Sequence, residues 1–91
     1  MKHIHKYTLP MGGWCAIQLP ACSRLLSAEE QHGAVALYAE VDRTKAADGQ
    51  LRMHMIMTGD LAPEGAEFLN TIMMAGGTYV VHVYAEWVRH G

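Results

Sequence analysis

Short runs of this sequence place an apolar residue at every second position. In residues 51–57 the side chains of Leu51, Met53, Met55 and Met57 fall on one face. Three other runs share the pattern: Cys15, Ile17 and Leu19; Val35, Leu37, Ala39 and Val41; and Tyr79, Val81, Val83, Ala85 and Trp87. A period of two residues is typical of a β-strand with one buried face. The pattern therefore predicts an all-β fold.

Turn signals divide the chain into seven predicted strands. These strands span 3–9, 14–19, 25–31, 34–41, 51–58, 68–74 and 78–88. His32-Gly33 predicts a tight connection and Gly76-Gly77 a hairpin turn, because glycine readily adopts the positive φ that such turns need. Residues 42–50 predict a longer hairpin loop, and 59–66 form the longest irregular stretch. Seven short strands at this spacing predict a small antiparallel β-sandwich or a partly closed barrel.

Two segments also carry helical signals. Ser27 and Glu30 match a capping box, but Gly33 would end that helix after little more than one turn, which favours a strand. Leu69, Ile72 and Met73 have the spacing of one helical face. A short helix near 64–74, beginning at Asp60 or Pro63, is therefore the alternative to a strand at 68–74.

Size, charge and cysteine content restrict the class of protein. The chain has 91 residues, which predicts a single domain over 1–91 with one modest core. A formal net charge of −2 argues against binding nucleic acid through a basic field. No apolar run reaches the length of a signal peptide or a membrane span. Two cysteines, Cys15 and Cys22, are too few for a disulfide scaffold, so we expect free thiols and a cytoplasmic location.

The order of several short motifs resembles a known family. They are Lys6-Tyr7-Thr8-Leu9-Pro10, Leu19-Pro20, Leu25-Leu26-Ser27, Gln31-His32-Gly33, Leu37-Tyr38-Ala39-Glu40-Val41-Asp42, Thr58-Gly59, Phe68-Leu69-Asn70-Thr71 and Val81-His82-Val83-Tyr84. In this order they resemble short, largely uncharacterised proteins of bacteria and their phages. The resemblance implies a compact β-rich domain in a phage or prophage setting. It transfers no active-site residue.

Polar and aromatic residues alternate with the apolar residues in two of the predicted strands. Arg52 and His54 lie opposite the methionine face of 51–58, and His82, Tyr84 and Glu86 lie opposite the apolar face of 78–88. If these two strands are neighbours, the five residues form one patch. Such a patch is either a set of ordinary cross-strand pairs or a recognition surface.

The sequence carries no local signature of catalysis. Two catalytic combinations can be nominated by residue type, Cys15 with a histidine and an acid, or His82 with Glu86. However, no nucleophile turn, zinc-protease motif or phosphate loop is present. We therefore expect a protein that is not an enzyme and has no cofactor. His3 and His5 share a strand face and are weak candidates for a metal site, with Cys22 or His90 as a third ligand.

The last predicted strand raises the question of what pairs with it. Residues 78–88 are rich in β-branched residues and carry no charge before Glu86. An unpaired strand of this kind is an aggregation hazard, so we expect pairing within the fold or with a second protomer. Trp87 and Val88 are the candidate interface residues, and a homo-oligomer is the expected state.

These observations favour function by binding. The hypothesis is a small phage-type protein that modulates host defence by occluding a protein or sequestering a small ligand. The alternatives are a self-assembling structural or virion-associated module, and a metal-binding protein that uses His3 and His5.

Overall fold

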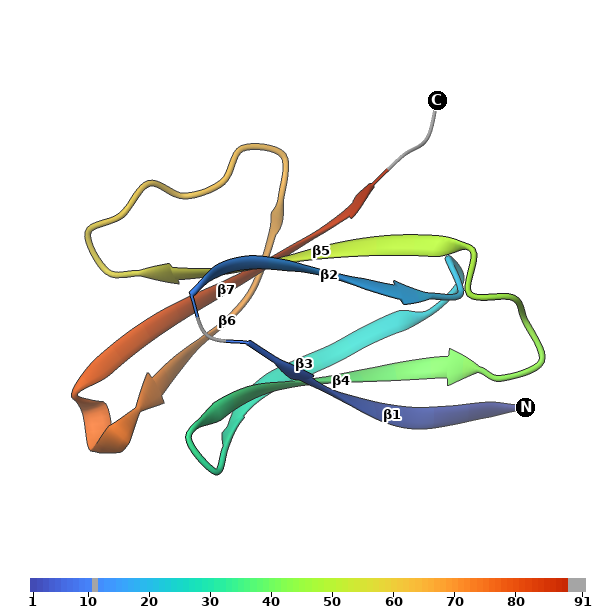
Figure 1. Cartoon of the computed structure of the whole chain (residues 1–91), viewed down its shortest axis with the longest axis horizontal. Helices are drawn as coiled ribbons and strands as arrows, with labels where there is room; N and C mark the ends of the chain where they lie inside the picture. Colours follow the sequence, from blue (N-terminus) through green and yellow to red (C-terminus); the bar gives the residue numbers. More distant parts are fainter. Residues whose placement is uncertain (11, 89–91) are drawn as a thin grey trace.

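Two antiparallel sheets make up the part of the chain that the computed structural model describes, residues 1–10 and 12–88 (Figure 1). The strands are β1 (Lys2–Leu9), β2 (Gly13–Leu19), β3 (Arg24–Gln31), β4 (Ala34–Asp42), β5 (Gly49–Met57), β6 (Glu67–Met74) and β7 (Tyr79–Val88), with a short 3-10 turn η1 (Ala75–Gly77). One sheet has the order β1-β4-β3 and the other β2-β5-β7-β6. The predicted seven-stranded β-sandwich is confirmed, in the open form and not as a barrel.

Residues 68–74 form a strand, so the helical alternative near 64–74 is wrong. Ile72 and Met74 are buried in β6 while Thr71 and Met73 are exposed. Burial therefore follows a period of two at this end of the strand, and packing against the core overrides the short helical spacing of Leu69, Ile72 and Met73.

The inner faces of the two sheets form one apolar core. Leu37, Leu51, Met53, Val81 and Val83 are fully buried, as the alternating pattern predicts. The pattern weakens at one end of the sandwich, where Met57 and Tyr79 are 38% and 52% exposed.

The chain crosses from one sheet to the other at three connections. The first two lie between β1 and β2 and between β2 and β3, and the third is the segment 43–48 between β4 and β5 (Figure 1). The predicted hairpin over 42–50 is therefore wrong, because β4 and β5 belong to different sheets. At this crossing Asp48 Oδ1 accepts a hydrogen bond from the Ala21 N–H at 3.0 Å, so two of the crossings are tied together.

A two-residue and a four-residue turn make the true hairpins of the described residues. His32 and Gly33, both at positive φ (52° and 81°), join β3 to β4, and η1 with Thr78 joins β6 to β7. The tight connection predicted from His32-Gly33 and the hairpin predicted from Gly76-Gly77 are thus confirmed.

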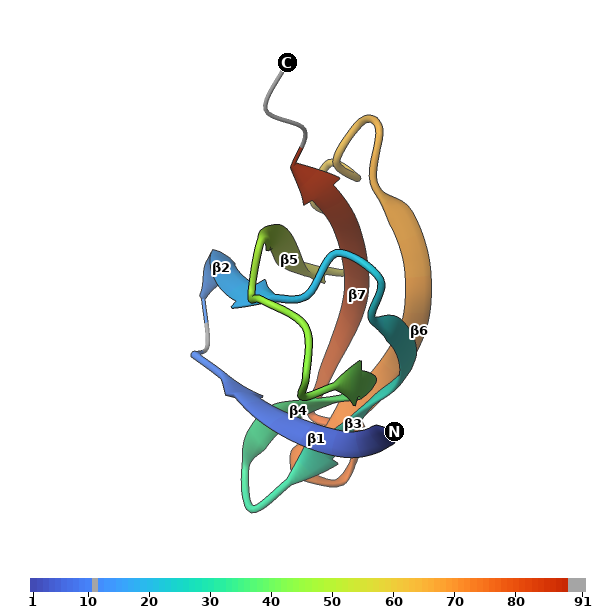
Figure 2. The ribbon, with the colours of Figure 1, turned by 90° about the vertical axis from the view of Figure 1, so that its right-hand side faces the viewer.

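Strand β7 lies inside its sheet, between β5 and β6. The expected pairing of 78–88 is therefore provided within the fold. The strands at the sheet margins are β1, β3, β2 and β6, and the margins of β3 and β6 meet (Figure 2). Across that meeting Asn70 Nδ2 donates to the Ala28 carbonyl at 2.6 Å, and Asn70 Oδ1 accepts from the Ala28 N–H at 3.1 Å.

Among the described residues no helix is long and apolar enough to cross a membrane.

Candidate functional site

The outer face of the four-stranded sheet brings the five predicted patch residues together. Strands β5 and β7 are hydrogen-bonded neighbours, with Arg52 opposite Glu86 and His54 opposite Tyr84. His82 lies one pair further along, opposite Ile56. Residues that oppose each other in an antiparallel pair point to the same side of the sheet. The condition that the sequence left open, that these strands adjoin, is therefore met.

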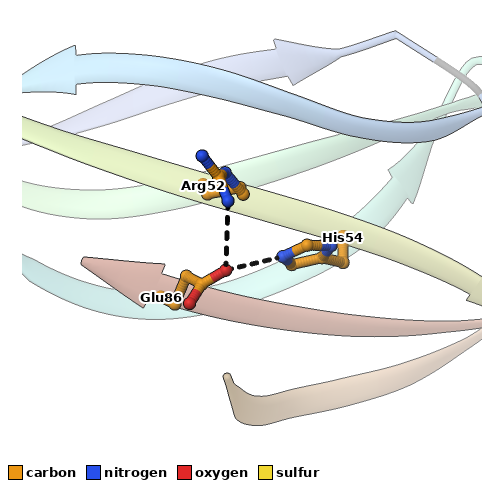
Figure 3. A network of polar contacts seen from close by, with 3 residues as sticks. All are labelled: Arg52, His54 and Glu86. Atoms are coloured by element: carbon orange, nitrogen blue, oxygen red, sulfur yellow. Dashed lines mark hydrogen bonds and ion pairs between the residues drawn. The ribbon is translucent and has the colours of Figure 1, made fainter. Parts of the chain in front are cut away.

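Glu86 is the centre of a three-residue network on this face (Figure 3). Its Oε1 accepts a hydrogen bond from His54 Nε2 at 3.0 Å and lies 3.8 Å from Arg52 Nη1. The His54 side chain is 15% exposed and that of Glu86 26%, so the pair is partly shielded from water. A charge-assisted hydrogen bond in such a setting fixes both side chains more firmly than a fully exposed ion pair does.

Aromatic rings extend the network to both margins of the sheet. The Arg52 guanidinium carbon lies 4.9 Å from the ring centroid of Trp14 on β2, within cation–π range. On the other side the rings of Tyr84 and Phe68 meet edge to face with centroids 5.5 Å apart. Trp14 and Phe68 are 59% and 56% exposed. We call the set Trp14, Arg52, His54, Phe68, His82, Tyr84 and Glu86 the polar-aromatic face.

His82 is held by two threonine hydroxyls, one from Thr58 just after β5 and one from Thr71 on β6. Its Nε2 lies 2.9 Å from Thr58 Oγ1, and its Nδ1 lies 3.0 Å from Thr71 Oγ1. A neutral imidazole donates through one nitrogen and accepts through the other, so one hydroxyl accepts and the other donates. Both ring nitrogens are thereby engaged, which fixes the ring orientation on the face.

The geometry does not assemble a catalytic triad from the residues considered. Glu86 pairs with His54 and not with His82, so the His82–Glu86 combination is not formed. Cys15 packs against the core, on the face of β2 opposite Trp14, and burial raises the pKa of its thiol, which disfavours the nucleophilic thiolate. The His54–Glu86 pair has no such thiol beside it on the outer face.

Hollows adjoin this sheet at both ends of β7. One, of about 230 Å³, lies beside Glu86 and is lined by Leu25, Gly65, Glu67 and Trp87 as well. The other, of about 370 Å³, lies at the opposite end of β7 and is mainly apolar, with Met55, Met57, Tyr79 and Val81 in its wall and Asp60 beside them.

The predicted metal ligands are not gathered into a site. His3 and His5 share one face of β1, where His5 lies against Tyr7 with ring centroids 6.3 Å apart. Cys22 is exposed in the turn between β2 and β3, and His90 lies outside the described residues. Within residues 1–10 and 12–88 no three His, Cys, Asp or Glu side chains are placed to hold a metal ion.

The two candidate interface residues point to opposite sides of β7. Trp87 packs against the core and adjoins Gly49, whereas Val88 is half-buried on the outer side, opposite Gln50. Trp87 therefore has a structural role at the sheet crossing.

Sequence reasoning missed Trp14 and Phe68. Trp14 does alternate with Cys15 and Ile17, so its outward direction was visible, but its position beside Arg52 depends on β2 pairing with β5. Phe68 faces outward because the register of β6 shifts between Phe68 and Asn70. No sequence signal marks that shift.

Comparison with known proteins yields a family. A family model described as a domain of unknown function, DUF7352, matches residues 1–90. The chain therefore belongs to this family. No curated protein and no solved structure matches it.

Proposed function

We propose that this member of the DUF7352 family is a non-catalytic protein that binds a partner protein through its polar-aromatic face. The observation that carries the proposal is that a fixed polar centre, Glu86 with His54 and Arg52, lies between two exposed aromatic anchors, Trp14 and Phe68. Aromatic residues and arginine are the residue types enriched at the energetic centres of protein interfaces.

The chemistry of the face indicates the chemistry of the partner. Arg52 and Glu86 largely balance each other's charge, so the face offers apolar contact and hydrogen bonding without a strong field. A matching surface would present apolar side chains around a few hydrogen-bonding groups. The rings of Trp14 and Phe68 would enter its apolar parts.

The resemblance to bacterial and phage proteins suggests where such a partner belongs. We place it in the bacterial host, with a defence protein as the partner and occlusion of its surface as the mode of action. The support for this step is the resemblance together with the exposed face.

The test begins with the tagged full chain as bait in bacterial lysate, followed by affinity measurements on the purified partner. Phe68→Ala should weaken binding about 30-fold, which corresponds to the ~2 kcal/mol loss of an energetically central residue. The matched control is Ile4→Ala, because Ile4 is 58% exposed on the outer face of the other sheet. Equal binding by wild type and Phe68→Ala, or an equal loss in Ile4→Ala, would contradict the proposal.

A second candidate function is sequestration of a small apolar ligand in the 370 Å³ hollow. Its volume lies within the range of small-molecule sites, and Met55, Met57 and Tyr79 make its wall adaptable. Titration with the neutral dye N-phenyl-1-naphthylamine should shift the methyl NMR signals of Met55 and Met57. Met73, which is 72% exposed on the outer side of β6, is the internal control. Unchanged Met55 and Met57 signals at saturating dye would remove this candidate.

A further inference from the structure

The four marginal strands of the sandwich differ in how their free edges are protected. Exposed strand edges attract other strands, and natural proteins protect them with charges, proline, bulges or cover from another segment. The edges of β3 and β6 are both irregular, with register shifts at Leu25/Ser27 and Phe68/Asn70. They also cover each other, because the Asn70 side chain occupies both the N–H and the carbonyl of Ala28.

Strand β1 carries its own protection. Lys2 and Lys6 are exposed along it, and His3 and His5 lie between them. Lysine on an edge strand opposes pairing with another chain, because the charge would be desolvated or brought against a like charge.

Strand β2 has none of these devices. Its seven residues, Gly13–Leu19, contain no charged residue and no proline, and its pairing with β5 is continuous without a register shift. Among the described residues, no strand pairs with its outer edge (Figure 2). Cys15 and Ile17 are half-buried on its inner side, and Trp14 is exposed on its outer side. A regular, uncharged edge of this kind is a template for a further strand.

We propose that β2 pairs antiparallel with β2 of a second copy of this chain, which joins the two four-stranded sheets into one. A second copy is the occupant that the sequence of β2 fits, since the uncharged strand brings no like charges together when it faces itself. A two-fold axis at Ala16 aligns all seven residues of the strand, with Ala16 facing Ala16 of the other copy. Such a contact is self-complementary, so it closes at a dimer.

This register gives each side chain a suitable neighbour. Cys15 lies opposite Ile17 of the second copy on the inner side, which covers two half-buried apolar residues. Trp14 lies opposite Gln18 on the outer side, and the small Ala16 at the axis leaves room for it. The dimer can be tested independently of partner binding, because its mass is measured on this chain alone.

The test is the mass of the full chain by sedimentation equilibrium over a dilution series. Wild type should have twice the chain mass at high concentration, and Ala16→Glu should abolish the dimer by facing two carboxylates across the axis. Thr8→Glu is the matched control, since Thr8 is an exposed outer-face residue of the other free edge, β1, and it should leave the dimer unchanged. A wild type that stays monomeric, or a dimer that survives Ala16→Glu, would overturn the proposal.

Cross-linking tests the register even where Ala16→Glu folds poorly. In a Cys15→Ala, Cys22→Ser background, Ala16→Cys should form a disulfide-linked dimer on mild oxidation because it faces its own copy. Gln18→Cys in the same background should not, because it faces Trp14. Equal cross-linking of the two variants would show that β2 does not pair in this way.

Discussion

The side-chain amide of Asn70 on β6 satisfies both the N–H and the carbonyl of Ala28 on β3, at 3.1 Å and 2.6 Å. This contact ties one sheet to the other at a margin where Ala28 is fully buried. Asn70→Ala removes both hydrogen bonds and leaves two backbone groups without partners. The free energy of unfolding, measured with urea, should fall by about 1–3 kcal/mol.

A second substitution in β6 distinguishes the loss of these two hydrogen bonds from a change in strand propensity. Met73→Thr lies in the same strand, replaces a 72% exposed side chain and retains a residue suited to strands. The urea midpoint of Met73→Thr should differ from that of wild type by no more than surface substitutions usually cause. An equal loss in both variants would show that Asn70 has no special role.

Gly49 makes a close approach at the sheet crossing. A Cβ placed there would lie 2.8 Å from the Ala21 Cα and 2.9 Å from Trp87 Cζ3. Since the first of these atoms is backbone, it cannot move aside cheaply. Gly49→Ala should therefore destabilise the fold by about 1–3 kcal/mol in thermal or urea unfolding. Gly33→Asn is the control, because its position is open and asparagine tolerates positive φ; a loss as large there would count against the steric explanation.

Asp42 gives the turn after β4 a pH dependence. The Thr44 hydroxyl donates to Asp42 Oδ1 at 2.6 Å and the Thr44 N–H donates to it at 3.0 Å, and these bonds lower the pKa of Asp42 from its ordinary value of 3.8. A carboxyl whose pKa is lowered by folding stabilises the fold above its ordinary pKa. That contribution is lost as pH falls through the lowered pKa.

The carboxyl carbon of Asp42, followed by NMR titration, should report this effect. Thr44→Val removes the hydroxyl hydrogen bond, which has the larger effect on the pKa of Asp42, so this pKa should rise toward its ordinary value. Thr78→Val removes a threonine hydroxyl from a different turn and should leave the titration unchanged. A titration of Asp42 that is the same in all three proteins would contradict the assignment.

The two thiols should react at different rates. Cys22 is exposed, whereas Cys15 is half-buried and burial raises the pKa of its thiol. Because the thiolate is the reactive species, iodoacetamide should modify Cys22 first at neutral pH, and the Cys15 rate should rise at higher pH. Mass spectrometry of wild type and Cys22→Ser measures both rates. In denaturant the two thiols should react at equal rates. Equal rates in the folded protein would contradict the prediction.

The strands could be predicted from local pattern, but their arrangement could not. The alternation of Leu51 and Met53, or of Val81 and Val83, reports burial within one strand, and burial is what the structure shows for them. The order β2-β5-β7-β6 depends on contacts between residues distant in sequence. Turn signals over 42–50 look the same whether the next strand returns to the same sheet or crosses to the other, which is why the predicted hairpin was wrong.

The candidate site divides in the same way. Arg52, His54, Tyr84 and Glu86 could be placed on outward faces from parity, and the pairing of β5 with β7 then brought them together. The specific partner of Glu86 depends on register, since a shift of two residues that placed Gln50 opposite Glu86 would have moved His54 out of its reach. His82 lies on the same strand as Glu86, four residues away, which is too far for contact in any register. The outward position of Phe68 depends on the register shift in β6, which cannot be recognised from the residue types there.

The Glu86 network should contribute measurably to stability. Glu86→Gln keeps the size of the side chain but removes the charge that holds His54 at 3.0 Å and Arg52 at 3.8 Å. Because both Glu86 and His54 are shielded in part from water, we expect a loss of about 1 kcal/mol in the free energy of unfolding. A double-mutant cycle with His54→Gln should return most of this loss as coupling between the two residues. Glu67→Gln is the control, because Glu67 lines the same hollow beside Glu86 and takes part in none of the ion pairs of the described residues. A coupling energy near zero would mean that the contact orients the polar-aromatic face without stabilising the fold.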